Sequence, residues 1–190
     1  MDMNKMNVFT FDAETNGLTG RAFSIGAVIY KDGKEVKTFY ARTPIEGDID
    51  PFVRDHVLPQ MEGMQITHQT YEGMLADFAS FFLKEKEGAH VIFHMGCPVE
   101  ARIIIDMHDL GLLGPFEGAY PWLDVAGMLL QAGFDPTSVD SYNREHGIEV
   151  PQPEPGGTHN PLYDSRAAAL CFMDLMKRRR DCDCNGGVER

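Results

Sequence analysis

Two carboxylates stand two positions apart where the first apolar run of the chain ends. Asp12 and Glu14 follow the apolar residues 8–11 and precede a turn signal, Asn16-Gly17. Side chains at positions i and i+2 of a strand point to the same face of a sheet. Two like charges on one face repel each other unless a cation lies between them. The spacing therefore predicts a metal-binding pair at the end of a strand.

A second pair of chemically competent residues lies about 150 residues later. His159 and Asp164 stand at the start of the last long helical pattern. At 100° per residue, Asp164 shares a helix face with Ala168, Cys171 and Leu175, which is the stripe expected to face the sheet. An unpaired carboxylate buried there would cost several kcal/mol or more, so it needs a cation, hydrogen bonds or a proton. The alternative is an ordinary Asp that interacts with the helix N-terminus.

A further acid is expected on the helix that begins near Pro98. Glu100 is surrounded by apolar positions on the helical wheel, and we expect it to be the fourth acid of the site. Asp106 lies at the edge of the same stripe and is the alternative, with Asp109 a weaker one. Each could instead be a solvated surface charge.

The elements that must position these residues follow from periodicity and turn signals. Strands are expected at 7–11, 22–30, 35–41, 90–94 and, as a short extended segment, 120–123. Helices are expected at 71–86, 98–110, 125–131, 138–145 and 161–179. Residues 44–68 and 151–157 are expected to be irregular, because proline and glycine interrupt them. Asp124 and Asn160 suit N-cap positions. Three strands in a meander followed by alternating helices and strands predict an α/β fold with a mixed sheet.

Composition limits the classes of function. The chain has 190 residues, of which 43% are apolar, enough for one domain with a full core. The net charge of −12 argues against extended, nonspecific binding of duplex nucleic acid. It leaves room for an enzyme whose bound cations offset the local charge and whose substrate is a short single-stranded end. We expect a cytoplasmic protein without membrane association, because neither a membrane span nor an export signal is present.

Two segments resemble motifs of the DnaQ-like DEDD exonucleases, in the subclass with a catalytic histidine (DEDDh). Residues 9–17, Phe-Thr-Phe-Asp-Ala-Glu-Thr-Asn-Gly, are similar to the first motif, and residues 159–164, His-Asn-Pro-Leu-Tyr-Asp, to the third. Residues 91–102 stand where the second motif, His-Asn-x-x-Phe-Asp, is usual. Here the chain departs from the pattern, because the acid after His94 is Glu100, one position later than expected.

The resemblance, which spans residues 7–175, implies both a fold and a reaction. The fold would be a mixed five-stranded ribonuclease-H-like sheet with helices on both faces, in an exonuclease domain of residues 1–176 followed by a basic and then polar tail, 177–190. The reaction would be 3′→5′ hydrolysis of nucleic acid ends to nucleoside 5′-monophosphates. Two ions, Mg²⁺ or Mn²⁺, would be held by Asp12, Glu14, Glu100 and Asp164. His159 would be the general base.

The resemblance also indicates a substrate-binding loop after the first motif. Thr15, Asn16, Gly17 and Leu18 would hold the terminal nucleotide of a single-stranded 3′ end, with Leu18 wedged against the last base. Leu18 could instead be a loop residue that covers the core. The sequence leaves RNA and DNA equally open, and a homodimer is compatible with the resemblance. The altered second motif supports one alternative, a nucleic-acid-binding or polymerase-associated module that keeps the fold but catalyses weakly.

Overall fold

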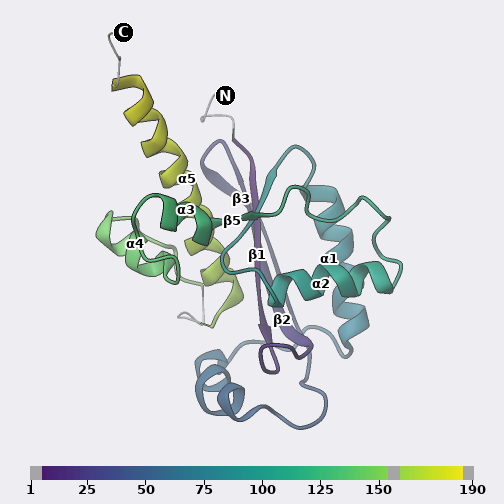
Figure 1. Cartoon of the computed structure of the whole chain (residues 1–190). Helices are drawn as coiled ribbons and strands as arrows, with labels where there is room; N and C mark the ends of the chain where they lie inside the picture. Colours follow the sequence, from purple (N-terminus) through teal and green to yellow (C-terminus); the bar gives the residue numbers. More distant parts are fainter. Residues whose placement is uncertain (1–5, 154–158, 186–190) are drawn as a thin grey trace.

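A five-stranded mixed sheet forms the centre of the molecule (Figure 1). The computed structural model describes residues 6–153 and 159–185, and for residues 180–185 the backbone alone. The strands are β1 (Val8–Thr15), β2 (Ala22–Lys31), β3 (Lys34–Arg42), β4 (His90–Phe93) and β5 (Leu123–Asp124). Their order is β3-β2-β1-β4-β5, with β1 to β3 antiparallel and with β4 parallel to both β1 and β5. The predicted meander and mixed sheet are therefore confirmed.

Helices cover both faces of the sheet, as predicted (Figure 1). One face carries α1 (Tyr71–Glu85) and α2 (Val99–Asp109). The other carries α3 (Val125–Gln131), α4 (Val139–Glu145) and α5 (Pro161–Asn185). In the described part of the chain, no helix combines the length and the apolar character that crossing a membrane requires.

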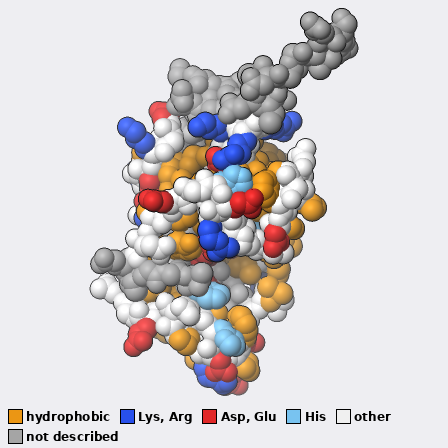
Figure 2. All heavy atoms as spheres, turned by 90° about the vertical axis from the view of Figure 1, so that its left-hand side faces the viewer, with side chains coloured by type: hydrophobic (Ala, Val, Ile, Leu, Met, Phe, Trp, Pro, Cys, Tyr) orange, Lys and Arg blue, Asp and Glu red, His pale blue; other side chains and the backbone are white. Residues whose placement is uncertain are grey.

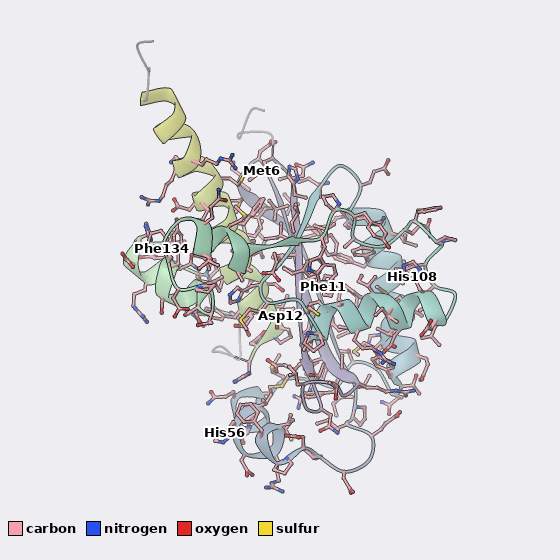
Figure 3. All side chains as sticks on the ribbon, viewed as in Figure 1. Met6, Phe11, Asp12, His56, His108 and Phe134 are labelled. Carbon is pink, nitrogen blue, oxygen red and sulfur yellow. The ribbon has the colours of Figure 1, made fainter. Side chains whose placement is uncertain are left out.

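Strict alternation along β1 separates the two cores. Phe9 and Phe11 point toward α1, where the Phe11 ring lies 4.9 Å from that of Phe78. Val8 packs on the opposite side with residues of α5. Because side chains alternate along a strand, Asp12 shares the α5 side with Val8 and Thr10. Figure 3 labels Phe11 and Asp12, two neighbouring residues whose side chains belong to opposite faces of the sheet.

Several segments differ from the sequence expectation. Strand β1 continues to Thr15 instead of ending at residue 11, and β5 begins at Leu123 instead of residue 120. Residues 44–68 contain a π-helical turn (Val53–Val57) and a 3₁₀ turn (Leu58–Met61). Their apolar side chains are spaced four residues apart and cover Phe23, which explains why a segment rich in proline still folds locally.

The last helix is longer than predicted. We expected it to end near residue 179, but α5 continues to Asn185, so the proposed domain boundary at residue 176 falls inside a helix. The basic residues 177–179 are exposed on it. Figure 2, which views the molecule from the side of α3, α4 and α5, shows Lys and Arg side chains gathered next to the grey region at the top.

Candidate metal centre

The end of β1 and the start of α5 bring three carboxylates together. Asp12, Glu14 and Asp164 each offer an oxygen, and these oxygens all lie within 4.8 Å of one another. The side chains are partly buried, and they come from positions about 150 residues apart in the sequence. The convergence expected from the two motifs is thus present in the fold.

Gly26 makes this convergence possible. It is the β2 partner of Asp12, and a Cβ atom at this position would lie 2.4 Å from the carbonyl carbon of Pro161 and 2.5 Å from the amide nitrogen of Leu162. The Ser165 hydroxyl donates to the Gly26 carbonyl oxygen at 2.9 Å. The first turn of α5 therefore rests on bare strand backbone. Sequence reasoning missed this residue, although a glycine inside an apolar strand is a signal of close backbone approach.

Burial and repulsion among the clustered carboxylates raise the pKa values of Asp12 and Asp164. Burial, followed by the charge of Asp164, raises the pKa of Asp12 well above its ordinary value. Burial, followed by the charge of Glu14, raises the pKa of Asp164 to about 8. A divalent cation would relieve both effects, because it supplies the missing positive charge. Carboxylate oxygens are hard ligands, so this donor set fits Mg²⁺ or Mn²⁺ better than softer metals.

The structure distinguishes the two candidates for the fourth acid. Glu100 is 4% exposed and accepts a hydrogen bond from the Ala13 amide at 3.1 Å. It lies outside the group of three oxygens, but its charge contributes to the raised pKa of Asp12, and burial raises the pKa of Glu100 itself to about 8. Glu100 is therefore next to the cluster and has no cationic partner among the described residues.

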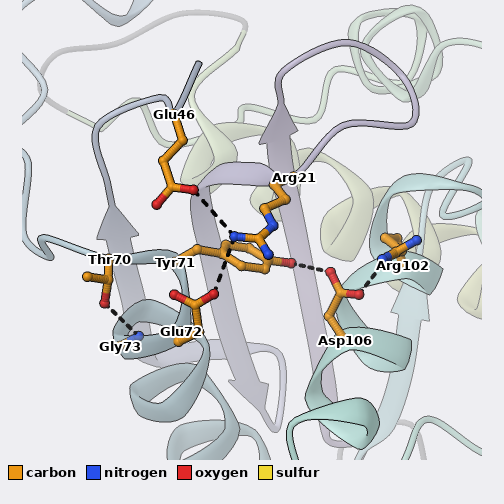
Figure 4. A network of polar contacts seen from close by, with 8 residues as sticks. All are labelled: Arg21, Glu46, Thr70, Tyr71, Glu72, Gly73, Arg102 and Asp106. Carbon is orange, nitrogen blue, oxygen red and sulfur yellow. Dashed lines mark hydrogen bonds and ion pairs between the residues drawn. The ribbon is translucent and has the colours of Figure 1, made fainter.

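Asp106, by contrast, belongs to a structural network (Figure 4). It accepts from the Tyr71 hydroxyl at 2.7 Å and from Arg102 Nε at 2.6 Å. Arg21 lies over the Tyr71 ring, 5.2 Å from its centroid, and also pairs with Glu72 at 3.3 Å. The network fixes α1 against α2, the helix that carries Glu100. Both oxygens of Asp106 are engaged, which favours Glu100 as the fourth acid.

His159 faces the cluster across a hydrogen bond. Its Nδ1 lies 3.2 Å from Oε1 of Glu14, and its backbone has a φ of +61°. The hydrogen bond to Glu14 raises the pKa of His159 above its ordinary value, while partial burial acts in the opposite direction. The predicted loop before His159 falls largely on residues 154–158, which lie outside the described residues.

The loop after β1 places its residues in different roles. Leu18 has 68% of its surface exposed, so it does not cover the core and is free to contact a ligand. The Asn16 side chain, in contrast, donates to the Asp48 carbonyl and accepts from the Asp50 amide, at 2.9 and 2.8 Å. Gly17 has a φ of +78° and forms the turn. Thr15 closes β1, where the register with β2 shifts.

Asp124 holds the segment that follows β4. It caps α3, as predicted, by accepting from the Ala126 amide at 2.9 Å. The same carboxylate also accepts from the amides of Met95 and Gly96, at 3.1 and 3.0 Å. Three backbone donors converge on one side chain, so Asp124 fixes the turn between β4 and α2. The two additional contacts could not be read from the sequence.

Comparison with known proteins identifies the architecture. No protein-family model matches the chain, and no curated protein matches it significantly. Among solved structures, Exonuclease X in complex with 5′ overhanging duplex DNA aligns with a TM-score of 0.62 and 19% identity, over 90% of this chain and 92% of that one. Pop2p of S. pombe in its Mg²⁺- and Mn²⁺-bound form aligns with a TM-score of 0.66 and 16% identity, over 92% of this chain and 84% of that one. The chain therefore has the ribonuclease-H-like α/β fold that these two structures share.

Proposed function

We propose that this protein is a metal-dependent 3′→5′ exonuclease of the DnaQ-like DEDDh type, acting on single-stranded RNA or DNA ends. The observation that carries the proposal is the gathering of Asp12, Glu14 and Asp164 within 4.8 Å, with His159 hydrogen-bonded to one of them. The motifs in which these residues stand are the ones that resemble that family. The first and third motifs meet at one point of the fold, and this meeting supports a metal site built from both.

The residues have distinct roles in this proposal. Asp12, Glu14, Glu100 and Asp164 would hold two ions, Mg²⁺ or Mn²⁺. Such ions lower the pKa of a water molecule and stabilise the charge that develops on the leaving 3′ oxygen. This chemistry would take place at the end of β1, where the carboxylates lie.

His159 would accept the proton of the attacking water. Its Nδ1 faces Glu14, which leaves Nε2 as the basic nitrogen of the neutral ring. The hydrogen bond that raises the pKa of His159 depends on the negative charge of Glu14. Neutralisation of Glu14 by a cation would therefore lower that pKa and favour the neutral, basic form.

The structural neighbours support this reaction class. One is an exonuclease solved with DNA, and the other was solved with Mg²⁺ and Mn²⁺. In this proposal the exposed Leu18 would pack against a terminal base, together with Thr15 at the end of β1. Asn16 and Gly17 would shape this loop and contribute through it, since the Asn16 amide already bonds to residues 48 and 50.

The test is digestion of matched RNA and DNA oligonucleotides, each labelled at the 5′ end, with Mg²⁺, Mn²⁺ or chelator. We expect a ladder that shortens from the 3′ end with either metal and no shortening with chelator or with Asp12→Ala. The two oligonucleotides give the sugar preference. Binding of oligonucleotide in Ca²⁺ without any shortening in Mn²⁺ would instead favour the weakly catalytic binding module.

A further inference from the structure

A small cavity adjoins the acid cluster and is lined by two of its carboxylates, Asp12 and Asp164. It has a volume of about 90 Å³ and is lined by side chains of β1, α5 and the end of β4, among them Thr10, Asp12, His94 and Asp164. A cavity needs about 10–15 Å³ of such space to hold one water molecule, so this cavity has room for ordered water. Buried cavities with polar walls are filled by ordered water, whereas apolar ones stay dry.

Thr10 gives the cavity a hydrogen-bonding group without a protein partner. Its side chain is 1% exposed, and its Oγ1 makes no hydrogen bond within the described part of the chain. A buried hydroxyl left in this state costs about 1–3 kcal/mol, so native proteins pair such groups with protein or with water. Two other polar groups that line the cavity have partners elsewhere. The Ser165 hydroxyl donates to the Gly26 carbonyl oxygen, and His94 Nε2 bonds to the Pro136 carbonyl oxygen at 3.0 Å.

The register of β1 determines what water bonded to Thr10 can reach. Thr10 and Asp12 are two positions apart on the same side of the strand, which separates them by about 6.6 Å along it. This separation is too long for a direct hydrogen bond between the two side chains. One water molecule can bridge two oxygens that lie about 5.6 Å apart, and side-chain rotation can bring the Thr10 and Asp12 oxygens within this distance. Asp164 forms the opposite wall of the same cavity.

We propose that Thr10 is a positioning residue which, through ordered water in this cavity, orients the carboxylates of Asp12 and Asp164 for metal binding. The inference rests on the proposed function, because it deepens the description of the same site. Water molecules in the cavity would donate hydrogen bonds to one oxygen of each carboxylate, so that the other oxygen points toward the metal ions. Groups that orient metal ligands in this way typically contribute 10–100-fold in metal affinity.

Thr10→Val and Thr10→Ser test the proposal. Valine keeps the shape of threonine but lacks the hydroxyl, whereas serine keeps the hydroxyl. We expect Mn²⁺ affinity, measured by calorimetric titration of the full chain, to fall at least ~10-fold in Thr10→Val and to stay near that of the unmodified chain in Thr10→Ser. The same threonine-to-valine change at Thr38, exposed on β3, serves as the matched control and should leave affinity unchanged.

A purely structural role gives the opposite result. If no water bridges Thr10 to the acids, removal of an unpaired hydroxyl raises the melting temperature of Thr10→Val and leaves Mn²⁺ affinity unaltered, which would overturn the inference. A crystal structure at high resolution offers a second check, with ordered water expected within 3.5 Å of Thr10 Oγ1. Failure of the unmodified chain to bind Mn²⁺ would overturn the proposed function instead.

Discussion

His159 and Glu14 show how single residues divide the work of the proposed centre. Glu14 offers one oxygen to the group of carboxylates and accepts a hydrogen bond at Oε1 from His159 Nδ1. This bond fixes which ring nitrogen carries the proton and which remains basic. In the proposed mechanism, His159 would be the proton acceptor, and its loss should leave the metal site intact.

We therefore expect His159→Ala to lose rate but not metal. Removal of a general base lowers turnover about 10²- to 10⁴-fold, while Mn²⁺ affinity should change little because His159 is not among the grouped oxygen ligands. Single-turnover digestion and calorimetric Mn²⁺ titration measure the two effects separately. His56→Ala, at an exposed site distant in sequence, is the control. Loss of metal affinity together with rate would make His159 a ligand instead.

The two acids of α2 give a second contrast between residues. Glu100 lies next to the cluster and has no cationic partner in the part of the chain that the structure describes, whereas Asp106 accepts hydrogen bonds from Tyr71 and Arg102. We expect Glu100→Gln to weaken Mn²⁺ binding while the fold is kept. Asp106→Asn should retain metal affinity but lower the free energy of unfolding by about 1–3 kcal/mol, because it weakens the buried hydrogen bond that the Tyr71 hydroxyl donates to a charged acceptor. If metal titration shows weaker Mn²⁺ binding in Asp106→Asn and unchanged binding in Glu100→Gln, and urea unfolding shows a loss of stability only in Glu100→Gln, Asp106 would be the fourth acid.

At the level of elements, the decisive contact is that between the first turn of α5 and β2. The helix lies against the sheet at Gly26, where no side chain intervenes. The position of Asp164 relative to Asp12 follows from this contact, since Gly26 and Asp12 are neighbours in register. A small change in helix position would therefore separate ligands that belong to different elements.

Gly26→Ala tests this contact. The added methyl group would lie 2.4 Å from Pro161 backbone, so α5 must move away from the sheet. Overpacking of this kind costs about 1–3 kcal/mol, and the movement should also weaken Mn²⁺ binding. Gly127→Ala in α3 is a matched control, because nothing lies within 4 Å of its added Cβ and alanine favours helix. Equal Mn²⁺ affinity in both variants would show that α5 can shift without separating the ligands.

Across the whole molecule, the cluster ties stability to pH and to metal. In the folded, metal-free chain the pKa values of Asp164 and Glu100 are about 8, against ordinary values of 3.8 and 4.5. The folded state thus binds more protons than the unfolded state between these limits. By linkage, the contribution of these two groups to the free energy of unfolding is fully present below about pH 4 and is lost as pH rises toward 8.

We expect the free energy of unfolding in chelator to fall as pH rises from 5 to 8. Mn²⁺ should oppose this fall, because metal that binds only the folded state stabilises it by about 2.7 kcal/mol at a hundredfold excess over Kd. Asp164→Asn should flatten the pH dependence, whereas Asp109→Asn, at an exposed position of α2, should not. Urea unfolding at several pH values measures the slope, and a stability that rises with pH in all three proteins would contradict the expectation.

Much of the fold was predictable because local patterns and tertiary packing agree. Alternation along β1 and the spacing of apolar residues in α1 predicted these two elements, although β1 continues to Thr15, and the resemblance indicated a mixed five-stranded sheet. The meeting of Asp12 with Asp164 was also foreseen. Contacts between distant backbones were not, because neither the Gly26 contact nor the bonds from Asn16 to residues 48 and 50 leave a periodic signal.

The late position of Asp164 has a consequence for the order of events during synthesis. The oxygens of Asp12 and Glu14 come from β1, but the third comes from α5, about 150 residues later in the sequence. A nascent polypeptide therefore lacks this group of three oxygens until the start of α5 has been synthesised, about 150 residues after β1. Under the proposed function, metal binding would report that α5 has docked, and a chain interrupted before α5 would be unable to cut nucleic acid.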